Sequence, residues 1–298
     1  MDQINLLARR FRALSEPLLP EETNSKPVLK KISGIKSVIF DFYGTLFISG
    51  VGDIGIDDGK SDAGLLLNAL KGTNITVEDP KAGQRGYEIY NRVVEDEIEE
   101  IKAGGIPYPE PDIRKVWKKV LTQMNEENLI SGTTLDHPDR MAVEFEARMN
   151  PVWPMPDLHE TLGGLIRREM TLGIISNSQF YTPIAFEALA GQTLSQLGFS
   201  EELLHWSFDE AMKKPGLLFY ERFQEKAKKA FPDLKPQNYL YVGNDMLKDV
   251  FPADACGMKT ALFAGDQRSL KWHKEDSRTK DLKPDLVVTE LRQILDCV

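Results

Sequence analysis

The chain has 298 residues, of which 41 % are hydrophobic and 28 % charged, as expected of a globular protein that builds its own core. Its formal net charge of −9 argues against a general nucleic-acid binder, which needs clustered lysine and arginine. No apolar run approaches the roughly 20 residues of a membrane span. The two cysteines, Cys256 and Cys297, have no metal-type spacing, so a reduced, cytoplasmic setting is expected.

Residues 1–36 are expected to form a helical arm followed by a linker. Apolar residues recur at helical spacing at the start of the chain, namely Ile4, Leu7, Ala8, Phe11 and Leu14, and a segment rich in proline and charge follows. The arm is expected to lie on the main body or on a second copy of the protein. A homodimer, through this helix or through the helical module below, is therefore left open.

The next part of the chain combines one strand with a long helical stretch. The run "IKSVIF" predicts a strand buried on both faces of a parallel sheet. From about residue 60 to 150 the apolar residues follow two helical stripes. The stripes are Tyr87, Tyr90, Val93, Val94, Ile98 and Ile101, and then Ile113, Val116, Trp117, Val120, Leu121 and Met124. We interpret residues 53–152 as one helical module.

After residue 152 helices alternate with short apolar strands. The strands are expected at "LGIIS", "HWSF", "YLYVG", "KTALFA" and "DLVV". This alternation predicts an α/β fold with a doubly wound parallel sheet, built from residues 37–52 and 153–298. The helical module interrupts the sheet between its first and second strands.

The string "GVGDIG", residues 50–55, matches the glycine pattern of dinucleotide-binding loops. In those loops a helix follows directly, whereas here the next helical signal starts at about residue 61. Acids close to the string, including Asp53, Asp57 and Asp58, would repel phosphates. A flexible acidic hinge into the helical module is the preferred interpretation.

Polar residues follow four of the expected strands, where ligands bind in doubly wound sheets. Asp41 follows "VIF", and Ser176 and Asn177 end and follow "LGIIS". Lys214 comes after the third strand, and "YLYVG" is followed by Asn244, Asp245 and Asp249. These side chains are expected to meet at one edge of the sheet.

In this order, the residues resemble the four motifs of the haloacid dehalogenase superfamily of hydrolases. The motifs are Asp41-Phe42-Tyr43-Gly44-Thr45, then Ser176, then Lys214-Pro215, then the acidic "YVGNDMLKD". The resemblance spans residues 37–290 and makes the sheet a Rossmann-like core and residues 53–152 a helical cap. It implies that Asp41 is a nucleophile that forms a covalent intermediate with a small anionic substrate.

The resemblance also assigns roles to the other motif residues. Tyr43, Ser176 and Lys214 join Asp41 as catalytic residues, and substrate contacts are expected from Phe42, Gly44, Thr45, Ser176, Asn177 and Lys214. A Mg²⁺ ion is expected on oxygens of Asp41, of the Tyr43 carbonyl, and of Asn244, Asp245 and Asp249. The usual first acid of the fourth motif is replaced by Asn244, so either Asn244 or Asp245 pairs with Asp249 in this role.

Tyr43 stands where phosphatases of the superfamily carry the aspartate that protonates the leaving group. Dehalogenases in the strict sense carry D-x-Y-G-T and release a halide, and Tyr220 also matches a tyrosine of theirs. The fourth motif is longer than theirs, and no arginine follows Thr45 closely. The favoured function is Mg²⁺-dependent, phosphatase-like hydrolysis. The alternatives are a 2-haloacid dehalogenase and a weakly catalytic homologue that binds a ligand or partner.

Overall fold

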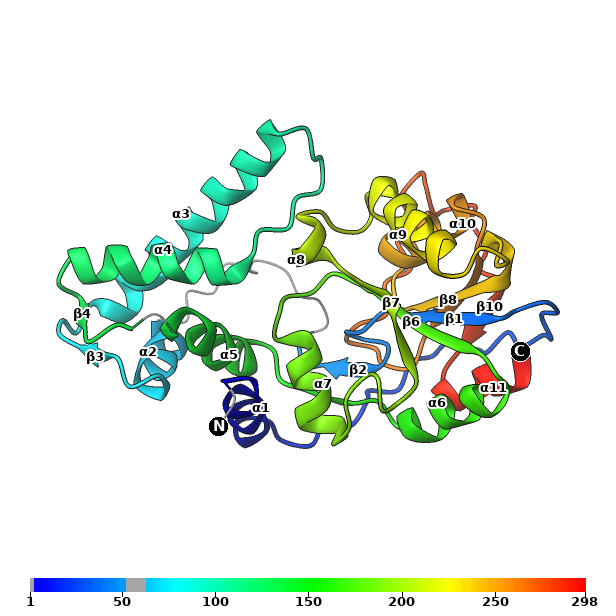
Figure 1. The fold of residues 1–298 in the computed structure, drawn as a ribbon, viewed down its shortest axis with the longest axis horizontal. Coiled ribbons are helices and arrows are strands. Elements are labelled where there is room, and N and C mark those ends of the chain that lie inside the picture. Colours follow the sequence, from blue (N-terminus) through cyan, green and yellow to red (C-terminus); the bar gives the residue numbers. More distant parts are fainter. Residues whose placement is uncertain (1–2, 52–62, 135) are drawn as a thin grey trace.

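The computed structural model describes residues 3–51, 63–134 and 136–298. Its main body is a six-stranded parallel sheet in the order β10-β9-β8-β1-β6-β7, with helices on both faces (Figure 1). The strands are β1 (Ser37–Phe40), β6 (Thr171–Ser176), β7 (Phe199–Trp206), β8 (Tyr239–Gly243), β9 (Lys259–Phe263) and β10 (Leu286–Val288). The doubly wound α/β sheet that the sequence predicts is confirmed.

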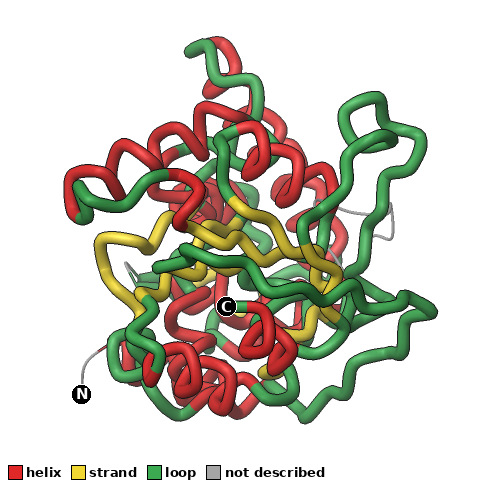
Figure 2. Tube along the Cα trace, turned by 90° about the vertical axis from the view of Figure 1, so that its right-hand side faces the viewer, coloured by secondary structure: helices red, strands yellow, loops and turns green. Residues whose placement is uncertain are grey.

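The central strand β1 buries side chains on both faces of the sheet. Val38 and Phe40 belong to the cluster that contains residues of α6 (Leu158–Arg167), α7 (Thr182–Ala190) and α11 (Ile294–Cys297). Ile39 points the other way, into the cluster with α9 (Leu217–Ala230) and α10 (Phe251–Ala255). Turned by 90°, the strands run between these two helical layers (Figure 2). A strand covered on both sides explains the continuous apolar run in the sequence.

The cap is a helical module inserted after the first strand of the sheet. It consists of α2 (Ala63–Gly72), α3 (Ala82–Ala103), α4 (Ile113–Glu126) and α5 (His137–Met149). A two-residue antiparallel pair, β3 (Thr76–Val77) with β4 (Ile130–Ser131), joins its far end. Tyr90, Trp117 and Phe145 form its aromatic centre, with the Trp117 ring 4.9 Å from Tyr90 and 5.1 Å from Phe145. The helical stripes of the sequence therefore form the core of the cap.

The chain enters and leaves the cap through a small antiparallel pair, β2 (Phe47–Ser49) with β5 (Val152–Pro154). The sequence pattern did not reveal this pair, because three residues are too few for a strand signal. The cap boundary that we expected at residues 152 and 153 falls inside β5. The other boundary, and most of the expected hinge at residues 50–55, lie outside the described residues.

The N-terminal helix α1 (Gln3–Leu14) lies on its own chain, where it contacts cap helix α5 and core helix α7 (Figure 1). Leu7 and Phe11 are its buried residues, and the Arg10 guanidinium pairs with the buried carboxylate of Glu144 on α5. Because α1 contacts both domains, it ties the cap to the core. Whether a second copy also binds here stays a prediction.

Two local differences from the sequence expectation concern the site edge. Strand β7 begins already at Phe199, and "SF" of the expected strand starts the short helix α8 (Ser207–Glu210) instead. A π-helical turn, Met246–Val250, follows β8 and carries Asp249.

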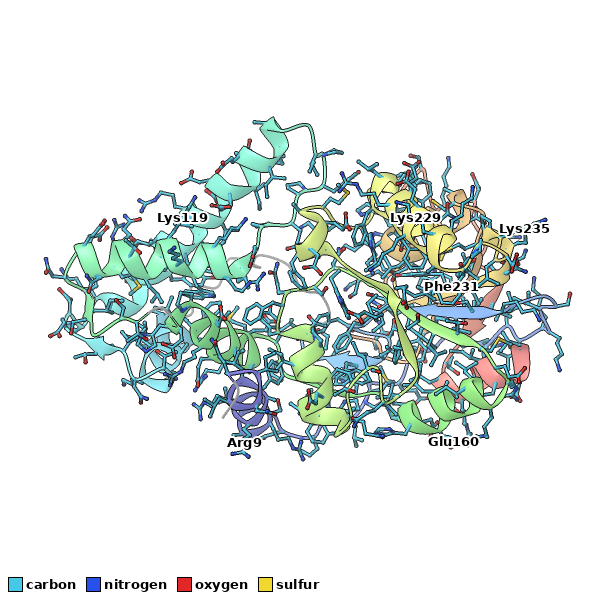
Figure 3. The ribbon with its side chains drawn as sticks, viewed as in Figure 1. Arg9, Lys119, Glu160, Lys229, Phe231 and Lys235 are labelled. Atoms are coloured by element: carbon cyan, nitrogen blue, oxygen red, sulfur yellow. The ribbon has the colours of Figure 1, made fainter. Side chains whose placement is uncertain are left out.

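On the outer surface of the protein, charged side chains such as Lys119 and Lys229 project from the helices (Figure 3). None of the helices in the described ranges is long and apolar enough to cross a membrane.

Candidate active site

The centre of the site is Lys214, whose ammonium lies between two carboxylates. Its Nζ is 2.8 Å from Oδ1 of Asp41, which follows β1, and 2.6 Å from Oδ1 of Asp249, which lies in the turn after β8. The side chain of Lys214 is only 3 % exposed. Adjacent parallel strands deliver Asp41 and Asp249 to one edge, and the chain after α8 delivers Lys214.

Two hydrogen bonds to the side chain of Asn177 hold the backbone of Lys214 in place. Its N–H donates to Oδ1 of Asn177 over 2.8 Å, and Nδ2 of Asn177 donates back to the carbonyl of Lys214 over 3.3 Å. Burial alone would lower the pKa of Lys214, but the carboxylates of Asp249 and Asp41 outweigh it and raise the pKa. The side chain is therefore an ammonium at neutral pH, positioned by Asn177.

Asp249 has hydrogen-bond donors at both of its oxygens. Oδ1 accepts from Lys214 and lies 3.0 Å from the hydroxyl of Tyr241, and Oδ2 accepts from the N–H of Asp245 over 2.9 Å. A Cβ on Gly243 would lie 2.4 Å from Cγ of Asp249, so glycine at this position gives the carboxylate its room. Burial raises the pKa of Asp249, although the ion pair with Lys214 acts in the opposite direction.

Asn244 and Asp245 are also engaged in internal contacts. Oδ1 of Asn244 accepts from the Thr45 hydroxyl over 3.1 Å, and its Nδ2 donates to the carbonyl of Ser269 over 2.8 Å. Oδ1 of Asp245 accepts two backbone N–H groups of the following turn, at 2.7 and 2.8 Å. Nε2 of His273 lies 3.0 Å from the same carboxylate. Asp245 thus acts as the N-terminal cap of the turn that carries Asp249.

These contacts bear on the expected Mg²⁺ ion, which needs several oxygen ligands that are free to bind it. Both oxygens of Asp249 and the amide oxygen of Asn244 already accept hydrogen bonds, and Asp245 caps a turn and contacts His273. In the parts of the chain that the structure describes, no three His, Cys, Asp or Glu side chains are grouped so as to hold a metal. The donor set does not fit a tightly held Mg²⁺ ion.

Tyr43 turns its hydroxyl towards core helix α7. Its oxygen is 2.9 Å from Oγ1 of Thr182, and its ring packs edge-on against Phe42 at 4.7 Å between centroids. Burial raises the pKa of Tyr43 well above its usual value, and the nearby Glu146 carboxylate of cap helix α5 adds to the effect. The raised pKa makes the phenol a weaker acid than an ordinary tyrosine. Tyr220, the second tyrosine noted in the sequence, donates to the carbonyl of Lys248 over 3.1 Å.

The remaining predicted residues divide between the pocket and its support. One pocket at the sheet edge is lined by Asp41, Tyr43, Asn177, Lys214, Asn244, Asp245, Lys248, Asp249, Ser269 and Lys271. Of the predicted residues, Phe42, Gly44, Thr45 and Ser176 are not among these lining residues. Ser176 is fully buried and donates to the carbonyl of Asn177 over 3.3 Å, and Phe42 stacks on Phe47 at 4.6 Å. Ser176 and Phe42 therefore support the structure around the pocket and do not line it.

Several functional-site residues were missed by sequence reasoning. Lys248 lies within the fourth motif but carries no family role, and Ser269, Lys271 and His273 lie in a loop without any motif. Tyr241 looked like an ordinary core residue of β8, yet its hydroxyl contacts both Asp249 and Lys214. A tyrosine in the middle of an apolar strand that leads into an acidic motif was the available signal for this contact.

The cap touches the rim of the pocket directly beside Lys214. The loop between α3 and α4 pairs with the segment before Lys214, where the Lys213 N–H donates to the Tyr108 carbonyl over 2.9 Å. Farther along the same loop, Glu110 accepts from Nε2 of Gln179 over 3.0 Å. These contacts place the cap over the carboxyl edge of the sheet.

Comparison with known structures identifies the architecture. A 2-haloacid dehalogenase from Pseudomonas syringae pv. Tomato DC3000 aligns with a TM-score of 0.50 and 17 % identity, over 88 % of this chain and 97 % of its own. The chain has the fold of the haloacid dehalogenase superfamily. At this low identity the similarity establishes the fold and leaves the reaction open.

Other haloacid dehalogenase-like structures align less well. The L-2-haloacid dehalogenase from Xanthobacter autotrophicus, with chloropropionic acid covalently bound, has a TM-score of 0.48 and 18 % identity, and the match covers 88 % of this chain and 97 % of that one. A putative HAD-hydrolase from Bacillus subtilis bound to magnesium has a TM-score of 0.46 and 12 % identity, with coverages of 90 % and 98 %. No family description and no curated protein sequence matches the chain.

Proposed function

We propose that the protein is a hydrolase in which Asp41 attacks a small anionic substrate and forms a covalent aspartyl intermediate. The observation that carries the proposal is the Lys214 ammonium, which contacts Asp41 and Asp249 in one pocket. A buried cation beside the nucleophile offsets the repulsion between the Asp41 carboxylate and an anionic substrate. Asn177 supports this arrangement because it holds the backbone of Lys214.

The leaving group departs without a proton in this proposal. At the position two residues after the nucleophile, the side chain is Tyr43, whose hydroxyl contacts Thr182 and whose pKa is raised. General acid catalysis contributes roughly 10²–10⁴-fold, so a substrate that needs a proton on its leaving group would react slowly. A halide or a stabilised phenolate suits this site.

The first candidate reaction is displacement of halide from a 2-haloacid. A carboxylate oxygen of Asp41 forms a bond to carbon 2 while the carbon–halogen bond breaks, and the halide leaves with the electron pair. Water then attacks the carbonyl carbon of the Asp41 ester, which releases the 2-hydroxy acid and a proton and regenerates the carboxylate. This sequence agrees with the internally bonded fourth motif, since it needs no metal ion.

The second candidate is Mg²⁺-dependent, phosphatase-like hydrolysis of activated phosphates. One observation favours it, namely that Asp41, Asn244 and Asp245 line the same pocket and could present oxygens to an ion if Asp245 released its present contacts. With Tyr43 in place of an acid, aryl and acyl phosphates are the expected substrates of this reaction.

A substrate panel tests the proposal. We would assay 2-chloropropionate, an aryl phosphate and an alkyl phosphate, each with Mg²⁺ and with EDTA, for wild type and Asp41→Asn. We expect halide release that is insensitive to EDTA, or turnover of the aryl phosphate alone, and its loss in Asp41→Asn. If the purified Asp41→Asn protein turned over substrate as fast as wild type, Asp41 would not be the nucleophile. The absence of all turnover would favour the binding homologue.

A further inference from the structure

The loop between cap helices α3 and α4, residues 104–112, is paired with the core segment that leads to Lys214. We call it the cap loop. An antiparallel bridge joins Pro109 of the cap loop to Met212 of the core segment. Beside it, the N–H of Lys213 donates to the Tyr108 carbonyl over 2.9 Å. The pairing with the cap therefore extends to the residue directly before Lys214.

The side chain of Glu110, in the same cap loop, contacts two different segments of the core. Its Oε1 accepts from Nε2 of Gln179 over 3.0 Å, and its Oε2 lies 3.2 Å from the hydroxyl of Ser207. Gln179 follows strand β6, and Ser207 follows strand β7. Both oxygens of a carboxylate that is only 15 % exposed therefore have partners on the core.

Both polar atoms of the Gln179 side chain are bonded to the cap. Besides its bond to Glu110, Nε2 donates to the carbonyl of Pro111 over 2.9 Å. Oε1 accepts from the N–H of Ile113, the first residue of α4, over 3.0 Å. Gln179 is buried in the core, and a buried polar group is costly without its partners. These bonds therefore favour the position in which the cap loop is docked on the core.

The core segments that hold the cap loop are also the segments that hold Lys214. Gln179 lies two residues after Asn177, whose side chain is bonded to the N–H and to the carbonyl of Lys214. The two segments are joined a second time, since the N–H of Ser178 donates to the Ser207 hydroxyl over 2.8 Å. A shift of the cap loop would therefore be transmitted to both segments that fix Lys214.

The position of the Lys214 ammonium leaves little tolerance for such a shift. Its Nζ contacts Asp41 at 2.8 Å and Asp249 at 2.6 Å at the same time. Misplacement of a catalytic group by about 1 Å can reduce a reaction rate by roughly 10²-fold. Contacts that fix the residues around Lys214 should therefore affect the reaction as well as the stability of the fold.

We propose that Glu110 and Gln179 are positioning residues, through which the docked cap loop sets the position of Lys214 beside Asp41. Docking of the cap loop completes the cationic site, and its release lets the Lys214 segment relax. The cap thereby couples its own closure to the assembly of the reacting groups. This inference rests on the proposed function, because that function makes Lys214 the cation beside the nucleophile.

Chemical labelling of lysines tests the position of Lys214 without any substrate. We would acetylate the folded protein briefly with dilute acetic anhydride and quantify each lysine by mass spectrometry. Lys229, which is exposed on α9, is the internal reference, whereas Lys214 is only 3 % exposed and should be protected in wild type. Gln179→Met removes the amide and keeps the length of the side chain. In this variant, labelling of Lys214 relative to Lys229 should rise about tenfold or more.

Two further variants separate this effect from a general loosening of the cap. Glu110→Gln should also raise the labelling of Lys214, because its amide nitrogen would face one of the two donors that the carboxylate accepts. Arg10→Met is the matched control. It removes the contact of α1 with Glu144 on cap helix α5 and leaves Glu144 its second partner, Arg148. Its Lys214 labelling should equal that of wild type, and thermal unfolding verifies that each variant is folded.

Kinetics on a substrate identified by the panel above adds a readout of the reaction itself. Glu110→Gln and Gln179→Met should lower kcat by roughly 10–100-fold, because the cation is no longer held beside Asp41. KM should change less than kcat, since neither residue lines the pocket. Arg10→Met should keep the kcat of wild type.

The outcomes separate this inference from the proposed function. Unchanged labelling of Lys214 in Glu110→Gln and Gln179→Met, an equal rise in Arg10→Met, or a wild-type kcat in a variant whose Lys214 is readily labelled would overturn it. Hydrolysis through Asp41 could still hold in each of those cases. Conversely, a rise of Lys214 labelling that is specific to the two variants supports the coupling even if Asp41→Asn shows that another residue carries the reaction.

Discussion

The hydroxyl of Tyr43 lies 2.9 Å from Oγ1 of Thr182 on core helix α7, and not beside Asp41, the proposed nucleophile. The contact joins the first motif to the start of α7. It gives Tyr43 a structural role at the base of the pocket, in a position where an acid would serve the leaving group. Without an acid at this position, substrates whose leaving group must be protonated should react slowly.

If Tyr43 has only this structural role, Tyr43→Phe should keep kcat within about threefold on a good substrate, because general acid help of ~10²–10⁴-fold is not being lost. The free energy of unfolding should fall by about 0.5–1.5 kcal/mol, the usual net contribution of one hydrogen bond. Steady-state kinetics and urea unfolding measure both. A loss of kcat by about a hundredfold would instead identify the phenol as the acid.

Lys214→Met should remove activity and destabilise the protein, because Asp41 and Asp249 would be left as buried carboxylates without their cation. We expect a loss of about 3–5 kcal/mol of unfolding free energy at alkaline pH. The loss should shrink towards acidic pH, since the pKa of Asp249 is already raised and protonation removes the repulsion. Urea unfolding of the variant at both pH values measures this.

Lys213→Met is the control for that experiment. Lys213 is the neighbouring lysine, is about one-third exposed and lies 3.9 Å from Glu110, a distance that makes only a weak ion pair. Its substitution should change the unfolding free energy by less than about 1 kcal/mol. Equal destabilisation by the two variants, or a Lys214→Met effect that ignores pH, would contradict the charge argument.

The buried carboxyl of Glu146 on cap helix α5 should make the free energy of unfolding depend on pH. Its Oε1 is buried and has no hydrogen-bond partner in the described ranges, and burial raises its pKa to about 7. The folded state thus holds a proton that the unfolded state, with a pKa near ~4.3, releases. Stability from this group is fully present below a pH of about 4.3 and is lost as the pH rises to about 7, by roughly 3–4 kcal/mol.

Glu146→Gln should flatten this part of the pH profile, because an amide stays neutral at every pH. The measurement is urea unfolding of wild type and variant between about pH 5 and pH 8. The difference between the two proteins isolates Glu146 from all other titrating groups. Parallel profiles would show that the carboxylate finds a solvated or paired environment in solution.

The fourth motif predicts weak binding of Mg²⁺ that a single substitution should strengthen. Asn244→Asp adds a carboxylate to the pocket next to Asp41, and charged oxygens are the ligands that Mg²⁺ prefers. Calorimetry should show at least about a tenfold gain in Mg²⁺ affinity over wild type. If wild type already binds the ion as tightly as the variant, the internal bonds of Asn244, Asp245 and Asp249 do not compete with the metal.

The sequence predicted the sheet and the edge of the site because both follow from strong local signals. Apolar runs located the strands, and polar residues after them converge wherever parallel strands end together. Side-chain directions were not predictable in this way. Ser176 stands at the expected strand end, yet its hydroxyl donates a hydrogen bond to the Asn177 carbonyl. The Asp249 oxygens accept hydrogen bonds from the hydroxyl of Tyr241 and from the N–H of Asp245.

The missed features share a different cause, since they depend on contacts between distant segments. The pair β2–β5 is too short for a periodic signal, and its residues are about 100 positions apart. Lys271 reaches the pocket because its backbone pairs beside Asp245. Such pairing is decided by tertiary packing, and the loop that contains Lys271 carries no motif of its own.

The central claim is that Asp41 becomes covalently bound to the substrate, and isotope labelling tests it most directly. The enzyme, in excess over its best substrate, is allowed one turnover in water enriched in heavy oxygen and is then quenched. Trypsin releases residues 37–60 as one peptide, because Lys36 and Lys60 flank it, and fragmentation locates the label. Attack on carbon predicts heavy oxygen in the Asp41 carboxylate after the turnover, and attack on phosphorus predicts a phosphoryl adduct on Asp41 in a sample that is quenched before the turnover is complete. Turnover with neither label nor adduct on Asp41 would contradict the proposed mechanism.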